Sequence, residues 1–234
     1  MFEPIDFTDR LQYVNDLPSK NGRIIVFGDS FAEYHLNGWV NLLAKKMNIK
    51  LLSYACSGSS LNYSVQNFFN YFNTDYDKND FIIFLFTGWG RVPFSLKGYS
   101  GRFQVGLLNF KNNIDDHRED AKDVYDYYAK NKTFWNQCIE NNIYSIDDYD
   151  NMKELMIGYL NGLPNKIFYF PSFMPFKNVN DMCMFDICVL ENRQNFNCEN
   201  HISFENRDIF ANLVYDYFTG DKKMSDFNIK MFKP

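Results

Sequence analysis

The sequence contains no long hydrophobic run. Its longest uninterrupted apolar stretch is FIIFLF at residues 81–86, far shorter than the about 20 apolar residues that a membrane-spanning helix requires. The N-terminal stretch MFEPIDFTDRLQYVNDL is acidic and lacks the apolar core of a secretory signal peptide. We therefore expect no membrane partner and a cytoplasmic location, with delivery as a component of a viral particle left open as an alternative.

Cysteine and histidine are scarce, with five and three residues in a chain of 234. The cysteines are irregularly spaced, and without a secretory signal this favours free thiols over a disulfide framework. Four residues separate Cys183 from Cys188, but no second cysteine or histidine pair completes a zinc site. We therefore expect neither a metal ion nor another cofactor.

Basic residues are also outnumbered by acidic residues. The chain has 24 lysine and arginine residues against 29 aspartate and glutamate residues, a net charge of −5. A protein that binds nucleic acid usually neutralises phosphates with a basic stripe, and none is present. Nucleic acid is therefore not an expected partner, and the sequence leaves the oligomeric state open.

What the sequence does contain is an alternation of two periodicities. Short apolar runs that indicate buried strands occur at residues 23–27, 50–54, 80–86, 166–170 and, more weakly, 185–190. Amphipathic helical spacing occurs at residues 38–47, 60–72, 115–135, 147–160 and 205–218. This alternation predicts an α/β fold, a three-layer α/β/α sandwich around a parallel sheet of about five strands.

The length and the 46% content of hydrophobic residues suit one domain of above-average size. We assign residues 23–234 to this domain, with an insertion at about residues 97–163. Residues 1–22 are predicted to form an N-terminal arm, helical as far as about Pro18. Ser59 or Ser60 is expected to cap the helix that begins near residue 60.

In a parallel sheet, ligands bind beyond the carboxyl ends of the strands. The first predicted strand is followed there by Gly28-Asp29-Ser30-Phe31. A serine at this point can expose its hydroxyl group and direct its backbone N–H toward a substrate, although a helix N-cap is the structural alternative. Asp29 is expected to shape the turn rather than to take part in chemistry.

The loops after the second and third predicted strands contain glycines. Gly58 would let the backbone approach a ligand closely and offer its N–H to an oxyanion. In the next loop, Gly90 likewise lets the backbone approach a ligand closely. Arg91 offers a charged hydrogen-bond donor to a substrate or to a surface salt bridge. Each loop alone is equally compatible with an ordinary turn between a strand and a helix.

Among the three histidines, His201 has the most informative position, just ahead of the closing helix at residues 205–218. A histidine there can return to the carboxyl edge of the sheet and serve as a general base. His117 lies in a charged run typical of a solvated helical face. His35 follows the serine loop without a recognisable context.

Together, these motifs resemble those of the SGNH/GDSL hydrolase family over residues 23–218. Ser30 matches the nucleophile of the first block, Gly58 the oxyanion glycine of the second, and His201 the histidine of the fifth. The resemblance implies a flavodoxin-like sandwich that hydrolyses an ester or O-acetyl group on a small molecule or glycan. It also implies that Ser30 and Gly58 supply oxyanion N–H groups, and we expect the Gly90 N–H to be a further donor.

The chain departs from the family pattern in two places. The third block, Gly-x-Asn-Asp, corresponds to Gly88-Trp89-Gly90-Arg91 here, so the asparagine that completes the oxyanion hole is missing. The fifth block, Asp-x-x-His, has Cys198 in the place of the aspartate. Glu199 could substitute for that acid only in a loop that is not helical, and a backbone carbonyl group is the other candidate to hold the imidazole.

These departures leave a second hypothesis open, a catalytically degenerate protein of the same fold that binds a ligand or carbohydrate. Loss of one oxyanion donor costs a factor of roughly 10²–10³ in rate, and loss of the orienting acid about 10⁴ in a serine protease. A third hypothesis, a nucleotide-binding flavodoxin-like protein, is disfavoured because Asp29 and Glu33 would stand where a phosphate must bind.

Overall fold

The computed structural model describes residues 13–18, 22–56, 59–88, 146–176, 182–191 and 201–234. The helix predicted at residues 115–135 and most of the insertion predicted at residues 97–163 lie outside these ranges.

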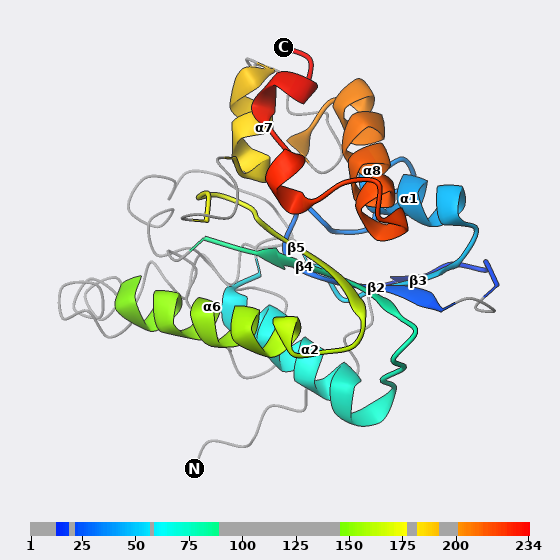
Figure 1. Ribbon diagram of the computed structural model, residues 1–234, viewed down its shortest axis with the longest axis vertical. Coiled ribbons are helices and arrows are strands. Elements are labelled where there is room, and N and C mark those ends of the chain that lie inside the picture. The colour runs from blue at the N-terminus through cyan, green and yellow to red at the C-terminus, as the bar shows by residue number, and fades with distance from the viewer. Residues whose placement is uncertain (1–12, 19–21, 57–58, 89–145, 177–181, 192–200) are drawn as a thin grey trace, which may run out of the picture.

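A five-stranded sheet in the order β1-β3-β2-β4-β5 forms the centre of the molecule (Figure 1). Its parallel strands are β2 (Arg23–Phe27), β3 (Lys50–Ser53), β4 (Phe81–Phe86) and β5 (Lys166–Pro171). Each is short, has an aliphatic or aromatic centre and is buried along almost its whole length, as expected for a sheet covered on both faces. The four parallel strands confirm the segments predicted from the sequence.

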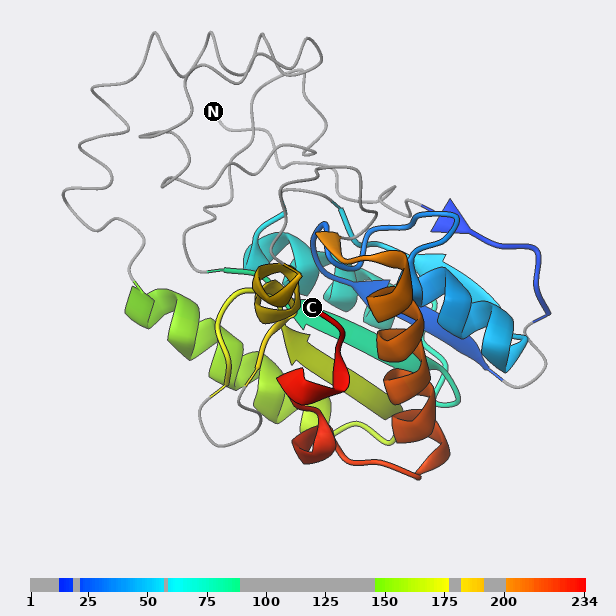
Figure 2. The ribbon, with the colours of Figure 1, turned by 90° about the horizontal axis from the view of Figure 1, so that it is seen from above.

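Helices cover both faces of the sheet, which confirms the three-layer sandwich (Figures 1 and 2). One face carries α1 (Trp39–Met47), α7 (Met184–Leu190) and α8 (Phe204–Thr219). The other carries α2 (Leu61–Thr74) and α6 (Ile146–Asn161). Two short 3₁₀ turns, Met224–Asp226 and Ile229–Met231, follow α8. No helix within the described ranges is both long enough and apolar enough to cross a membrane.

Two elements differ from the sequence prediction. Residues 185–190 were expected to form a strand, but they belong to the helix α7. The Asp186 carboxylate caps the first turn of this helix by accepting a hydrogen bond from Cys183 N at 2.7 Å. Met184 and Ile187, three residues apart, are both buried, so this run, apolar except for Asp186, packs with helical periodicity.

The second difference is at the N-terminus. Residues 13–14 were expected to be helical, but they form β1 (Tyr13–Val14), an antiparallel edge strand beside β3. Asn15 secures this pairing, because its side-chain oxygen accepts a hydrogen bond from Leu51 N at 2.9 Å while its own N–H donates to Leu51 O at 3.2 Å. The fifth strand of the sheet is therefore at the N-terminus and is antiparallel.

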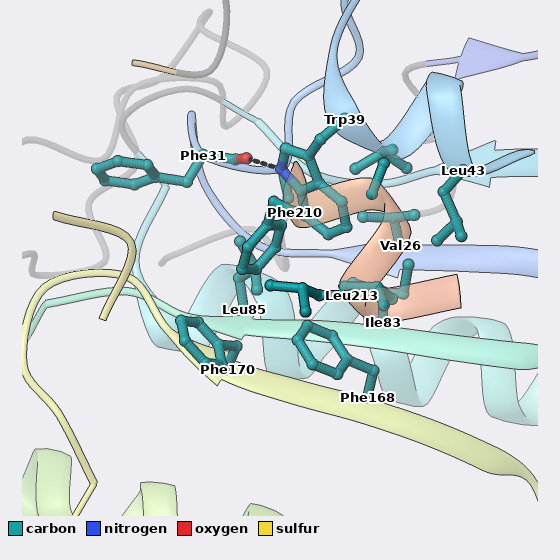
Figure 3. Close-up of a cluster of buried hydrophobic side chains, with 14 of the residues drawn as sticks. Val26, Phe31, Trp39, Leu43, Ile83, Leu85, Phe168, Phe170, Phe210 and Leu213 are labelled. Atoms are coloured by element: carbon teal, nitrogen blue, oxygen red, sulfur yellow. Dashed lines mark hydrogen bonds between the residues drawn. The ribbon is translucent and has the colours of Figure 1, made fainter. Parts of the chain in front are cut away.

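Alternate residues of each strand enter opposite hydrophobic layers. In β2, Val26 enters the layer beneath α1 and α8, whereas Phe27 enters the layer above α2 and α6. Trp39 is fully buried in the first of these layers, where its ring meets Phe210 at 4.7 Å in a T-shaped pair (Figure 3). Its indole N–H donates to the carbonyl oxygen of Phe31 at 2.6 Å, which links this core directly to the loop after β2.

A buried polar network closes the amino-terminal end of the sheet. The Arg23 guanidinium binds the fully buried Asp80 carboxylate at 2.6 Å and Asp75 at 2.7 Å. The Tyr71 hydroxyl donates to the same Asp80 carboxylate at 2.7 Å. Burial, reinforced by this hydrogen bond, raises the pKa of Tyr71 well above its ordinary value. This network is thus structural, and it lies opposite the end of the sheet at which ligands bind in such folds.

Candidate active site

The loops that follow the parallel strands meet at the carboxyl edge of the sheet. Gly28 O accepts two hydrogen bonds from the loop after β3, one from Cys56 N at 3.1 Å and one from Ser59 Oγ at 2.8 Å. Ser172 N, just after β5, donates to Phe86 O at the end of β4 at 2.8 Å. These bonds hold the loop segments in fixed positions around the end of β2.

Gly28 is required by the backbone at this point. Its φ angle is 154°, and a Cβ atom added to it would lie 2.9 Å from Leu85 Cβ. Real Cβ atoms do not approach so closely, so only glycine lets the chain leave β2 in the direction that it takes. The glycine of the Gly-Asp-Ser motif is therefore required on steric grounds in this fold.

Asp29 is fully buried and organises the turn that follows. Its carbonyl oxygen accepts from Ala32 N and Glu33 N, both at 2.9 Å. Its carboxylate oxygen Oδ1 accepts from Phe31 N and from Ser172 Oγ, both at 3.1 Å. These contacts match the turn-shaping role expected for this residue.

Ser30 follows Asp29 in this turn and is 7% exposed. The structural alternative for Ser30 was the N-cap of the next helix, but α1 begins at Trp39 and its N-cap is Gly38. The hydroxyl of Ser30 is therefore not used to cap that helix. Of Ser59 and Ser60, the two residues predicted to cap α2, Ser60 is the N-cap, and its hydroxyl oxygen accepts from Tyr63 N at 3.3 Å.

His201 lies beside this turn. Its imidazole ring contacts the Phe31 ring at a centroid distance of 4.9 Å, and Phe31 is the residue after Ser30. The Phe31 ring lies apart from the other labelled core side chains (Figure 3), and it also meets Phe173 at 5.3 Å. The contact between Phe31 and His201 thus places the predicted histidine beside the loop that carries Ser30.

The backbone at His201 has an uncommon conformation. Its φ angle is 60°, in the left-handed region, which non-glycine residues enter rarely and histidine more often than most. Its carbonyl oxygen accepts a hydrogen bond from Cys188 Sγ at 2.8 Å. Two residues later, Ser203 caps α8 by accepting from Asn206 N at 3.3 Å. His201 therefore sits in a tight turn immediately before a capped helix.

Ser172 and Glu191 take part in this arrangement without having been identified from the sequence. Ser172 follows β5 directly, so its place at the carboxyl edge was the available signal. Glu191 lies at the end of α7, where its carboxylate oxygen accepts from Ser203 N at 2.8 Å and from Asn206 Nδ2 at 2.7 Å. No sequence pattern indicated that contact, because α7 was expected to be a strand.

Several predicted site residues lie outside the described ranges: Gly58, Gly90, Arg91, Cys198 and Glu199. His35 is within them, and its Nε2 lies 3.9 Å from the Glu33 carboxylate. Across the part of the chain that the structure describes, no three His, Cys, Asp or Glu side chains form a group that could hold a metal ion.

A hollow of about 360 Å³ lies at the other end of the sheet, beside the first residues of β5. Two of its polar lining groups are bonded within the protein, since Lys166 Nζ donates to Phe218 O at 2.8 Å and Tyr217 OH to Ile167 O at 2.7 Å. The hollow lies at the amino-terminal ends of the strands, whereas Ser30 follows the carboxyl end of β2. The candidate site is therefore the carboxyl edge and not this hollow.

Comparison of the chain with protein-family models, with curated proteins and with solved structures gave no match. The site is characterised by its own geometry. Ser30 lies in the turn that follows β2, and the His201 ring contacts the ring of the next residue, Phe31.

Proposed function

We propose that this protein is a serine hydrolase, similar to the SGNH/GDSL hydrolases, that cleaves an ester or O-acetyl group on a small molecule or glycan. The observation that carries the proposal is the 4.9 Å contact between the rings of Phe31 and His201. It brings a potential general base from the C-terminal part of the chain to the residue beside Ser30. A nucleophile with an adjacent base is the arrangement that acyl transfer requires.

In the first half of the reaction, His201 accepts the hydroxyl proton of Ser30 as Ser30 Oγ attacks the acyl carbon. The carbonyl π electrons move onto oxygen, and a tetrahedral oxyanion forms. The backbone N–H groups of Ser30 and Gly58 are the proposed donors to this oxyanion, with Gly90 in place of the missing asparagine. The intermediate then expels the alcohol, which takes the proton from His201, and an acyl-enzyme remains.

In the second half, water replaces the alcohol. His201 takes a proton from the water molecule, whose oxygen attacks the acyl carbon of the acyl-enzyme. The second tetrahedral intermediate collapses, the acid leaves, and the proton returns to Ser30 Oγ. The cycle needs no cofactor, and Arg91 is the residue proposed to contact an acidic or polar part of the substrate.

The surroundings of Ser30 support this division of roles. The Asp29 carboxylate is occupied by two hydrogen bonds that hold the turn, so Asp29 supports the nucleophile's position rather than acting as the base. The turn is held by Gly28, Asp29 and Ser172, and a nucleophile fixed in this way pays little orientational entropy during the reaction.

A second candidate is a catalytically degenerate protein that binds a ligand or carbohydrate at the same edge. The observation that favours it lies in the sequence, where the oxyanion asparagine is absent and Cys198 stands where the family has its orienting acid. Such a protein would bind saturably without turnover.

Labelling with a fluorophosphonate probe separates the two candidates, with p-nitrophenyl acetate hydrolysis measured in parallel. The wild-type protein should be labelled and should turn over, and Ser30→Ala and His201→Ala should abolish both. His35→Ala is the matched control, because His35 lies in the same loop region as Ser30 yet has no proposed role, and it should retain both. Absence of labelling in folded wild-type protein would reject the hydrolase and leave the binding protein.

A further inference from the structure

Helix α7 joins the two halves of the candidate site. At its beginning, Phe185 N donates to Ser172 O at 2.8 Å. The side chain of the same Ser172 donates to Asp29 Oδ1 at 3.1 Å, in the turn that carries Ser30. The first turn of α7 is therefore connected to the nucleophile loop through one residue.

The other end of α7 holds the segment that carries His201. Cys188 Sγ donates to the His201 carbonyl oxygen at 2.8 Å. Glu191 Oε1 accepts from Ser203 N at 2.8 Å, two residues beyond His201. Residues three apart lie on the same side of a helix, so both bonds act on the same turn of the neighbouring chain.

The groups that form these bonds are themselves fixed. Asn206, the second donor to Glu191 Oε1, is fully buried, and its side chain also pairs with the backbone of Lys233 in both directions at 2.8 Å. Met184 and Ile187 are 0% exposed and anchor α7 in the core layer shared with α8. Both helices lie on the same side of the sheet (Figure 1), so the connection is between rigid elements.

We infer that α7 positions His201 relative to Ser30 by fixing the backbone of the turn that carries His201. Glu191 and Cys188 are positioning residues: they act on the backbone of the His201 turn rather than on a substrate. The kinetic part of this inference rests on the proposed function. A displacement of about 1 Å in a reacting group costs about 10²-fold in rate, so a backbone anchor is enough to affect catalysis.

The test uses Glu191→Ala, Glu191→Gln and Cys188→Ala in the full chain. Asp226→Ala is the matched control, because Asp226 makes the same kind of bond, accepting from Lys223 N at 2.8 Å, in a turn unrelated to His201. The first readout is the imidazole C–H signal of His201 in NMR spectra, identified by its loss in His201→Ala. The second is kcat and KM for p-nitrophenyl acetate.

Glu191→Ala should shift and broaden the His201 signal and lower kcat by about 10²-fold with little change in KM. Cys188→Ala should do the same to a smaller extent, and Glu191→Gln, which keeps an acceptor oxygen, should restore most of kcat. An unchanged His201 signal in both alanine variants would overturn the inference, even for an inactive wild-type protein. If Glu191→Ala does not fold, Cys188→Ala decides. Failure of the proposed function shows separately, as a wild-type protein without turnover.

Discussion

Ser172 Oγ donates a hydrogen bond of 3.1 Å to Asp29 Oδ1, which ties the end of β5 to the turn that carries Ser30. Both residues are fully buried. The bond spans 143 positions in the sequence and places a structural constraint directly beside the proposed nucleophile. It implies that the geometry of the site and the stability of the fold depend on the same contact.

Replacing Ser172 tests that dependence. Ser172→Ala removes a hydrogen bond to a carboxylate, and such bonds contribute about 1.5–3 kcal/mol. The midpoint of urea denaturation should fall accordingly, and hydrolysis of p-nitrophenyl acetate should decrease by more than the folded fraction does. Thr219→Ala, which removes only exposed side-chain hydrogen bonds at the end of α8, is the control and should change neither. Full activity in folded Ser172→Ala would show that the bond does not position Ser30.

Gly28 should tolerate no side chain. Gly28→Ala places a Cβ atom 2.9 Å from Leu85 Cβ at a φ angle of 154°, and we expect a loss of about 1–3 kcal/mol in the free energy of unfolding. Gly158→Ala is the matched control, since nothing lies within 4 Å of the added atom in α6, and it should stabilise by about 0.5–1 kcal/mol. Opposite signs in urea denaturation are the expected result, and equal effects would contradict the steric explanation.

The network of Arg23, Asp80 and Tyr71 predicts a loss of stability at alkaline pH. Burial first, and the bond to Asp80 second, raise the pKa of Tyr71 in the folded protein, while an unfolded tyrosine ionises near pH 10. Below about pH 10 both states keep the proton and the full stability is present. Above it the unfolded state loses the proton first, so stability falls as the pH rises.

Tyr71→Phe removes this contribution. Its free energy of unfolding should be lower than that of the wild type at pH 7, because the bond to Asp80 is lost. Above pH 10 it should fall less steeply, by up to about 1.4 kcal/mol per pH unit, the value for one proton. Urea denaturation between pH 8 and about pH 11 measures both quantities, and identical alkaline slopes in the two proteins would disprove the assignment to Tyr71.

Two cysteines on neighbouring turns should react differently with alkylating reagents. Burial raises the pKa of the Cys183 thiol to about 12, and its thiolate fraction at pH 8 is correspondingly small. Cys188 is only partly buried. Peptide mapping after brief iodoacetamide treatment should find Cys188 modified well before Cys183, and denatured protein should show equal modification of both. Faster modification of Cys183 in the folded protein would be inconsistent with its buried position.

The local sequence pattern was sufficient to predict most of the helices and strands that the structure describes. The parallel strands are short apolar runs, and α1, α2, α6 and α8 have the periodicity of amphipathic helices, so each could be predicted within a few residues. The N-cap of α2 was narrowed to Ser59 or Ser60 for the same reason, because capping depends on neighbours in sequence, and the structure has Ser60. Periodicity failed at residues 185–190, a short run in which Asp186 is the one charged residue, and packing of Met184 and Ile187 selects the helix.

The sequence by itself determined the sandwich and indicated Ser30 and His201 as candidates, because strand, helix and turn signals lie within a few neighbouring residues. Only the tertiary structure decided that β1 pairs with β3, that Phe31 brings the two candidates together, and that α7 connects their loops through Ser172 and Glu191. These are contacts between residues far apart in the chain. Their energies depend on where the whole fold places each group, which no local pattern encodes.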